Sequence, residues 1–183
     1  MRVISGTKKR LQLQTVQGLK TRPTTDRIKE TLFNMIGNDV YHCRFLDLFA
    51  GSGQMGIEAL SRGARCAYFI EKDKKAINCI RHNLEHTQLT EQSVVVSGDV
   101  IAALKGFSHK DAFDIIFMDP PYQLGLEQKV LEVICTHGIL SPEGYLIVEA
   151  ALDTDFSFLE QMPLEMIKEK IYKTNKHVFI AMK

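Results

Sequence analysis

The chain has 183 residues, of which 45% are hydrophobic and 25% charged, with a formal net charge of +1. These values are typical of a soluble globular protein of one domain. No stretch approaches the ~18 apolar residues of a membrane-spanning helix. The first residues also lack the apolar core of a secretion signal, so we expect a cytoplasmic protein that contacts no membrane.

The four cysteines form no C-x-x-C pair, which excludes zinc fingers and a thioredoxin motif. Basic residues are concentrated at the start of the chain: residues 1–30 contain eight lysines and arginines against two acidic residues, whereas the remainder contains 15 against 20. This asymmetry indicates an anionic partner such as RNA, although a merely solvated terminus would also explain it. We predict a basic N-terminal arm or hairpin over residues 1–24 and a main domain over residues 25–183.

The predicted elements begin with a helix over residues 25–37, which Thr24 or Thr25 can cap. From residue 44 onward, strands and helices alternate, which argues for a mostly parallel sheet with helices on both faces. The last two predicted strands are separated by only four residues and therefore form an antiparallel hairpin. We thus expect an α/β fold with seven strands. The strands are predicted at 44–50, 66–71, 93–99, 113–119, 144–150, 165–172 and 177–183, and the intervening helices at 54–62, 74–86, 100–105 and 125–137.

A glycine-rich loop follows the first predicted strand and opens the next helix. Its residues are Gly51-Ser52-Gly53-Gln54-Met55-Gly56, and Gly51 and Gly53 allow backbone N–H groups to approach a ligand closely. Glu71 lies 20 residues after Gly51, at the end of the second predicted strand, where a carboxylate can bind ribose hydroxyls. The sequence therefore predicts a nucleoside-containing cofactor at the carboxyl ends of the strands.

The glycine pattern alone leaves NAD and S-adenosylmethionine (SAM) open. Asp47 precedes the first glycine by four residues, where it would repel a pyrophosphate but attract the amino group of a methionine tail. Asp99, at the end of the third predicted strand, can contact the adenine amine or cap the following helix. These two carboxylates favour SAM.

A second motif, Asp119-Pro120-Pro121-Tyr122, ends the fourth predicted strand. The exocyclic amine of a nucleic-acid base is a poor nucleophile because its lone pair is delocalised. Asp119 and a backbone carbonyl, that of Pro120, can each accept one N–H bond from such an amine and aim its lone pair, while Tyr122 stacks on the base. A rigid turn is the alternative interpretation, but an acid and an aromatic residue at a strand end favour a ligand site.

The glycine loop, Glu71, Asp99 and the Asp-Pro-Pro-Tyr motif, in this order, resemble class I SAM-dependent N-methyltransferases. Together with the segments at 1–6, 21–30 and 56–64, they resemble the RsmD family, which methylates N2 of one guanine in bacterial 16S rRNA. The resemblance extends from residue 1 to about residue 150. It implies a Rossmann-like fold, SAM as cofactor with S-adenosylhomocysteine (SAH) as product, no metal, and 16S rRNA in a small-subunit assembly particle as partner of a monomeric enzyme.

The resemblance also implies roles for individual residues. The cofactor-binding residues would be Asp47, Gly51, Ser52, Gly53, Glu71, Lys72, Asp99 and Val100. The catalytic residues would be Asp119, Pro120, Pro121 and Tyr122, and the lid and substrate residues Arg22, Thr24, Thr25 and Arg10. The sequence departs from the family pattern at three places, which are Gln54-Met55 in the glycine loop, Lys8-Lys9-Arg10 in place of a Gly-Arg pair, and Ile171-Tyr172-Lys173, which no glycine follows.

Two other functions remain as alternatives. A DNA adenine or cytosine N-methyltransferase can share the Asp-Pro-Pro-Tyr chemistry, but 183 residues leave no room for a target-recognition domain of usual size. The second alternative is an NAD-dependent oxidoreductase or a non-catalytic nucleotide-binding module, and we find no hydride-transfer set of His, Lys and Tyr that the oxidoreductase would need. The pattern from His82 to His86 matches a zinc protease motif, yet it lies on a predicted solvated helix face. Glu149, at the end of the fifth predicted strand, is expected to have a structural or rim role.

Overall fold

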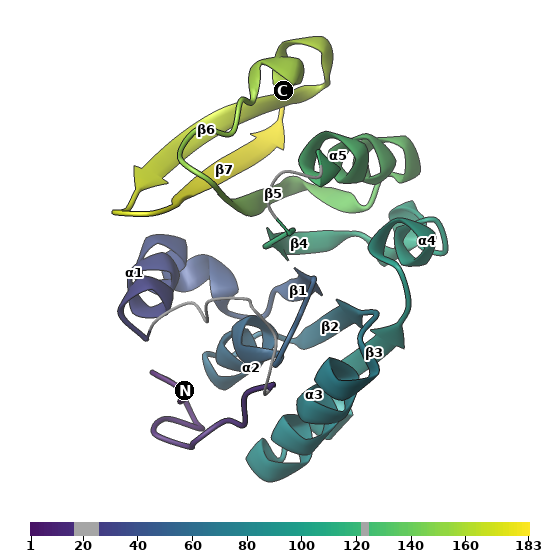
Figure 1. Cartoon of the computed structure of the whole chain (residues 1–183). Helices are drawn as coiled ribbons and strands as arrows, with labels where there is room; N and C mark the ends of the chain where they lie inside the picture. The colour runs from purple at the N-terminus through teal and green to yellow at the C-terminus, as the bar shows by residue number, and fades with distance from the viewer. Residues whose placement is uncertain (17–25, 122–124) are drawn as a thin grey trace.

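The computed structural model describes residues 1–16, 26–121 and 125–183. Helices and strands alternate along the chain as the sequence predicts (Figure 1). The helices are α1 (Asp26–Ile36), α2 (Gln54–Ser61), α3 (Lys74–Thr87), α4 (Val100–Leu104) and α5 (Leu126–His137). The strands are β1 (Arg44–Leu48), β2 (Cys66–Glu71), β3 (Ser93–Ser97), β4 (Phe113–Met118), β5 (Leu140–Ala150), β6 (Leu164–Ile171) and β7 (Lys176–Met182).

The strands form one seven-stranded sheet in the order β3-β2-β1-β4-β5-β7-β6. The first five strands are parallel, and β7 is antiparallel to both β5 and β6. Central strands such as β1 bury side chains on both faces, which is the pattern of a parallel sheet covered by helices. The predicted α/β fold with a terminal antiparallel hairpin is therefore confirmed.

Two hydrophobic clusters cover the two faces of the sheet. One contains Phe45 and Phe117 together with the apolar sides of α1, α2 and α3. The other contains Leu46 and Met118 together with α4 and α5. Figure 1 shows these two sets of helices on opposite sides of the strands. Odd-numbered positions near the ends of β1 and β4 therefore face the first set of helices, which decides where the polar residues at the strand ends lie.

The start of β5 differs from the prediction. The strand begins at Leu140, whereas the sequence predicted a start at residue 144. Ser141-Pro142-Glu143-Gly144 has the composition of a turn, but its backbone continues the pairing with β4 through a register shift between Phe113 and Ile115. A side chain at Gly144 would approach the carbonyl oxygen of Asp114 to 2.7 Å, so this irregular pairing depends on glycine.

The N-terminal segment packs on α2 rather than extending into solvent. Val3 and Leu13 are buried in the same cluster as α1–α3, and an isolated bridge joins Arg2 to Gln12. At the carboxyl end of α2, the Thr7 amide donates to the carbonyl of Ser61, and the Lys8 amide to its hydroxyl. The basic turn at residues 8–10 is therefore held at that end of α2. The predicted boundary at residue 24 lies outside the described residues.

A buried carboxylate on α2 connects the segment to α1. Glu58 is fully buried and accepts hydrogen bonds from the amides of Ile4 (2.8 Å) and Ser5 (3.0 Å). It also pairs with Lys29 (Nζ to Oε2, 3.4 Å) and Arg62 (Nε to Oε1, 2.8 Å). The Lys29 ammonium, which is fully buried as well, donates to the carbonyl of Arg2. Three separate segments thus converge on one carboxylate.

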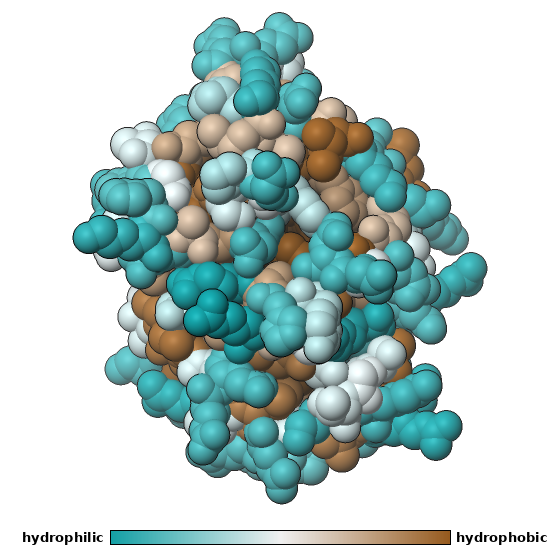
Figure 2. Space-filling model, turned by 180° about the vertical axis from the view of Figure 1, so that it is seen from behind, coloured by the Kyte–Doolittle hydropathy of each residue, from teal (hydrophilic) through white to brown (hydrophobic). Residues whose placement is uncertain are grey.

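The surface is mostly polar on the face turned away from the viewer of Figure 1, where apolar residues form only separate patches (Figure 2). Across the described ranges, every helix falls short of the length and apolarity that crossing a membrane requires. The four cysteines are free thiols.

Candidate functional site

Four acidic side chains occupy the carboxyl ends of four adjacent strands. Asp47 of β1 pairs in register with Phe117 of β4, and Asp119 lies two residues beyond Phe117 on the same face. Met118 pairs with Val148, so the next residues, Asp119 and Glu149, are neighbours. Glu71 likewise shares the face of Phe69, which packs with α1–α3. We call Glu71, Asp47, Asp119 and Glu149 the acidic row.

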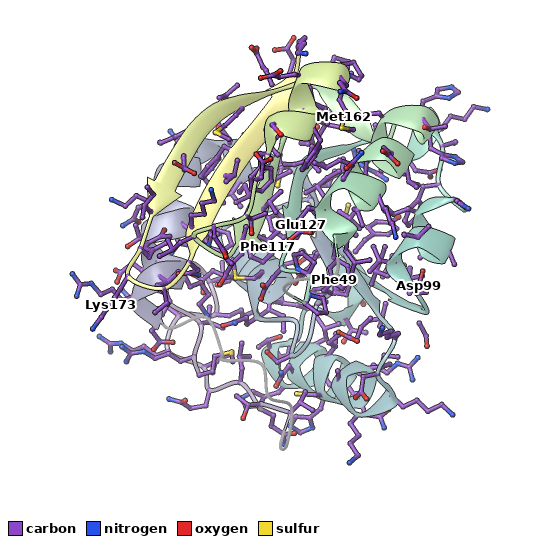
Figure 3. All side chains as sticks on the ribbon, turned by 45° about the horizontal axis from the view of Figure 1, so that its top comes forward. Phe49, Asp99, Phe117, Glu127, Met162 and Lys173 are labelled. Atoms are coloured by element: carbon purple, nitrogen blue, oxygen red, sulfur yellow. The ribbon has the colours of Figure 1, made fainter. Side chains whose placement is uncertain are left out.

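The glycine loop begins at one end of this row. Gly51 and Gly53 have φ values of +56° and +77°, in the left-handed region that other residues rarely adopt. Their conformation turns the chain from β1 directly into α2, and the Gly56 amide then donates to Asp47 Oδ2 at 3.0 Å. The first turn of α2 is thereby fixed to the end of β1. Phe49 of this loop, labelled in Figure 3, packs against the hydrophobic cluster that contains α4 and α5.

Glu71 fixes the other side of the loop. Its Oε2 accepts the Gly51 amide at 2.9 Å, and its Oε1 accepts the amides of Lys72 and Asp73. Because a carboxylate has about four acceptor directions, these bonds leave one for a ribose hydroxyl. The sequence predicted Glu71 at the loop but not that it holds the loop by three backbone bonds.

Asp47 is almost fully buried, with 1% of its surface exposed. Burial raises its pKa well above the usual range, the hydrogen bond from Gly56 opposes this, and the charges of Asp119 and Glu71 add to the rise. Burial, followed by the charge of Glu149, raises the pKa of Asp119 to about 8. A cation placed against the acidic row would relieve this repulsion.

Asp99 has the capping role that was one of its two predicted roles. Its Oδ1 accepts the amides of Ile101 and Ala102, which makes Asp99 the N-cap of α4. The side chain is exposed beside α4 (Figure 3), and Val100 behind it is buried. A contact between Asp99 and a ligand stays a prediction.

The remaining predicted site residues fall into three groups. Pro120 is buried and Pro121 exposed, directly after Asp119. Arg10 lies in the basic turn beside the carboxyl end of α2, whereas the glycine loop lies at the opposite end of that helix, so the structure does not bring Arg10 to the acidic row. Tyr122 and the lid residues Arg22, Thr24 and Thr25 lie outside the described residues.

A network at Glu149 was not found from the sequence. Asn175 Nδ2 donates to Glu149 Oε1 at 2.5 Å, and His177 Nε2 lies 3.2 Å from Glu149 Oε2. The Tyr172 hydroxyl lies 3.2 Å from His177 Nδ1. All but Tyr172 are buried. The position of Glu149 at a strand end was a usable signal, but its partners come from the terminal hairpin, whose register the sequence did not predict.

The histidine pair on α3 lies on an exposed face of the helix. The rings of His82 and His86 are stacked with their centroids 6.4 Å apart, and both residues are exposed. Within the ranges that the structure describes, no group of three or more His, Cys, Asp or Glu side chains could hold a metal ion.

Comparison with known proteins gives concordant results. A family model described as Conserved hypothetical protein 95 matches residues 1–181. A Bacillus subtilis protein provisionally named rRNA methyltransferase YlbH is 44% identical over 150 residues, covering 81% of this chain and 82% of that protein. Ribosomal RNA small subunit methyltransferase D of Haemophilus influenzae is 34% identical over 171 residues, covering 93% and 88%. An Escherichia coli structure provisionally named methyltransferase yhhF superposes with a TM-score of 0.85 at 31% identity, covering 100% and 98%.

Proposed function

The chain belongs to the family described as Conserved hypothetical protein 95, and from this premise we propose that it transfers a methyl group from SAM to the exocyclic N2 amine of a guanine in 16S rRNA. The relatives named above as rRNA methyltransferases support rRNA as substrate. The observation that carries the proposal is the acidic row, which joins a nucleoside-type loop at Gly51 to Asp119 across adjacent strand ends. The resemblance to the RsmD family noted from the sequence agrees with this membership.

The residues at the strand ends fit SAM. SAM supplies an electrophilic methyl group on a positively charged sulfur. The acidic groups of the row at Asp47, Glu71 and Asp119 suit that charge, because a cation beside them favours their ionised forms, whereas the pyrophosphate of NAD would oppose that ionisation. Glu71 would bind the ribose. Asp47, Gly51, Ser52 and Gly53 would hold the methionine end, and Lys72, Asp99 and Val100 the adenosine end.

Asp119 and the Pro120 carbonyl would hold the target amine. Each accepts one N–H bond, which pulls the nitrogen toward tetrahedral geometry and directs its lone pair at the methyl group. A neutral Asp119 still offers its carbonyl oxygen as acceptor, so a raised pKa is compatible with this role. Positioning of this kind can contribute about 7–11 kcal/mol to lowering the barrier. Tyr122 would stack on the base, which must be unpaired or turned out of its helix.

The basic arm and the lid residues complete the proposal. Residues 1–24 would contact RNA phosphates, with Arg10 in the arm and Arg22, Thr24 and Thr25 over the site, while residues 25–183 carry the chemistry. We propose a monomer that acts in the cytoplasm on a small-subunit assembly particle. It releases SAH together with the proton that the amine loses once it is methylated.

The test compares cofactors and substrates directly. Calorimetry should detect binding of SAM but not of NAD. Tritium from methyl-labelled SAM should then appear in small ribosomal subunits or 16S rRNA taken from cells that lack the enzyme, and digestion should yield N2-methylguanine. Label in DNA alone would support the DNA methyltransferase alternative, and binding of NAD without SAM would reject the proposal.

The affinity for SAM relative to SAH is expected to depend on pH. Asp119, with a pKa of about 8, is neutral below that pH and anionic above it. A fixed positive charge on SAM favours the anion, whereas SAH has none at sulfur, so SAM should gain affinity over SAH as pH rises from 6.5 to 9. If bound SAM lowers the pKa of Asp119 by one unit, the ratio of SAM affinity to SAH affinity changes by about tenfold over this pH range. Calorimetry with both ligands measures it, and Asp119→Asn should reduce the pH dependence of the ratio to the part that Asp47 contributes.

A further inference from the structure

We infer that a groove at the carboxyl end of α2 binds an unpaired nucleotide of the RNA substrate, with Tyr41 stacking on its base and basic residues at the rims holding its phosphates. This inference rests on the proposed function and adds a second RNA contact, at the end of α2 opposite the glycine loop. Neither Tyr41 nor Arg65 was among the site residues that the sequence predicted.

The groove lies between the N-terminal segment and the turn that follows α1. It has a volume of about 500 Å³, and its walls include Gly6, Asn38, Tyr41 and Arg62. Gly6 lies directly on the end of α2: a side chain there would approach the carbonyl oxygen of Ser61 to 1.7 Å, so this packing requires glycine. The volume falls within the roughly 300–1,000 Å³ of small-molecule sites, so the groove can accept a nucleotide.

Tyr41 offers an exposed aromatic ring in a fixed orientation. Its surface is 65% exposed. The ring lies against the backbone of Gly63, where a side chain would come within 2.7 Å of Tyr41 Cδ2, and the ring of His42 meets it edge-on with centroids 4.2 Å apart. A ring held on two sides loses little rotamer freedom when a base stacks on it. Every base has a face that can stack, so this contact would give affinity without selecting a sequence.

Basic side chains lie at both rims of the groove. The Lys9 amide donates to the carbonyl of Gly6, which places the basic turn at one rim. The Arg65 amide donates to the carbonyl of Cys43, which places Arg65 beside the segment before β1, at the other rim. Lys9, Arg10 and Arg65 are exposed, and none of them forms an ion pair with another described residue. Cations around an exposed ring suit single-stranded RNA, whose backbone follows a basic groove while its bases stack.

The other charged groups at the groove do not cancel this positive charge. Arg62 Nε donates to Glu58 Oε1 at 2.8 Å, and its guanidinium lies 4.9 Å from the centroid of the Phe33 ring, so these two charges balance each other. Asp39 is exposed, but its Oδ2 accepts the Tyr145 hydroxyl at 3.2 Å. The basic residues at the two rims therefore outweigh the acidic ones.

Backbone strain at both rims is an independent observation. Arg10 in the basic turn has a φ of +74°, and His42 next to Tyr41 has a φ of +62°. Residues other than glycine seldom adopt this left-handed region, and those that do cluster at functional sites. Strain on both sides of one groove therefore agrees with a binding site whose shape is set before the ligand arrives.

A fluorescent reporter at Tyr41 provides the test. The chain contains no tryptophan, so Tyr41→Trp places a single indole in the groove, and a base that stacks on it should quench its fluorescence. We expect saturable quenching by a single-stranded oligoribonucleotide of about six nucleotides. Arg65→Gln in the same background should reduce the slope of log affinity against log salt by about 0.7, the value for one phosphate contact on a single strand.

Met166→Trp is the matched control. It places the indole in another groove, of about 430 Å³, that is lined by the acidic residues Asp155, Glu160 and Glu165. The same oligonucleotide should leave its fluorescence unchanged, because those carboxylates repel phosphates.

Affinity of the labelled oligonucleotide for variants without tryptophan gives a second readout. Tyr41→Phe should keep the affinity of the wild type, whereas Tyr41→Ala should lower it by about 5-fold or more, the range for loss of one stacked base. Affinity for SAM and the Tm identify the variants that fold. Absence of saturable quenching in folded Tyr41→Trp would overturn the inference, as would equal quenching in Met166→Trp or an unchanged affinity in Tyr41→Ala.

Failure of this inference differs from failure of the proposed function. Methyl transfer to 16S rRNA without quenching at Tyr41→Trp would reject the groove alone. Quenching without methyl transfer to any RNA would instead reject the proposed function.

Discussion

Replacement of Asp119 by alanine should lower the rate of methyl transfer by about 10²–10³-fold, the usual cost of losing one positioned hydrogen-bonding group at a reacting centre. The target amine would keep only the acceptor expected at Pro120, and its lone pair would no longer be directed at the methyl group. Binding of SAM at pH 6.5, where Asp119 is mostly neutral, should change little, because Glu71 and the glycine loop hold one another without Asp119. Single-turnover transfer of labelled methyl at saturating SAM measures the first effect, and calorimetry the second.

Asp119→Asn is the matched control. It keeps a carbonyl oxygen at the same place and removes the titrating group, so it should retain far more activity than the alanine variant. If Asp119→Ala turned over at the rate of the wild type, the role assigned to this residue would be wrong. A parallel loss of SAM binding would instead indicate that Asp119 belongs to the cofactor site.

Replacement of Glu58 by alanine should cost about 3–5 kcal/mol of folding stability, because it leaves the buried ammonium of Lys29 without its counter-charge. The amides of Ile4 and Ser5 would lose their acceptor as well. For a chain of this size, such a loss lowers Tm by roughly 10 °C. Differential scanning calorimetry of the full chain measures it.

Glu85→Ala, on the exposed side of α3, provides the comparison and should change stability by no more than about 0.5 kcal/mol. Lys29→Met in the Glu58→Ala background should recover part of the lost stability, since it removes the unpaired charge. A Glu58→Ala variant as stable as Glu85→Ala would show that the buried cluster contributes no net stability.

The sequence predicted most of the fold because its strands are apolar and its helices are bounded by clear signals. The predicted range of β2, residues 66–71, agrees with the structure, as a continuous apolar segment followed by the Asp73 cap of α3. The early start of β5 was missed because Ser141–Gly144 has turn composition. Only its pairing with Phe113 in the folded chain extends the strand there.

The sequence predicted the part of the candidate site that is formed by residues at the carboxyl ends of the strands. Asp47, Glu71 and Asp119 could be placed together because parallel strands end at one edge of the sheet. The hydrogen bonds of Glu71 to three backbone amides depend on loop conformation, which residue types do not specify. The partners of Glu149 come from β7 and the turn before it, 26 and 28 residues later, and their register appears only in the folded sheet.

The attachment of the basic turn to α2 fixes the distance between that turn and the glycine loop. Eight helical residues span about 12 Å, with the glycine loop at one end and the turn containing Lys8 and Arg10 at the other. An RNA that engages both must bridge that distance, so recognition would require two-point attachment. A single nucleotide can occupy only one of the two points. The enzyme would then discriminate between RNAs by whether they can span the length of α2, as well as by the base that they present.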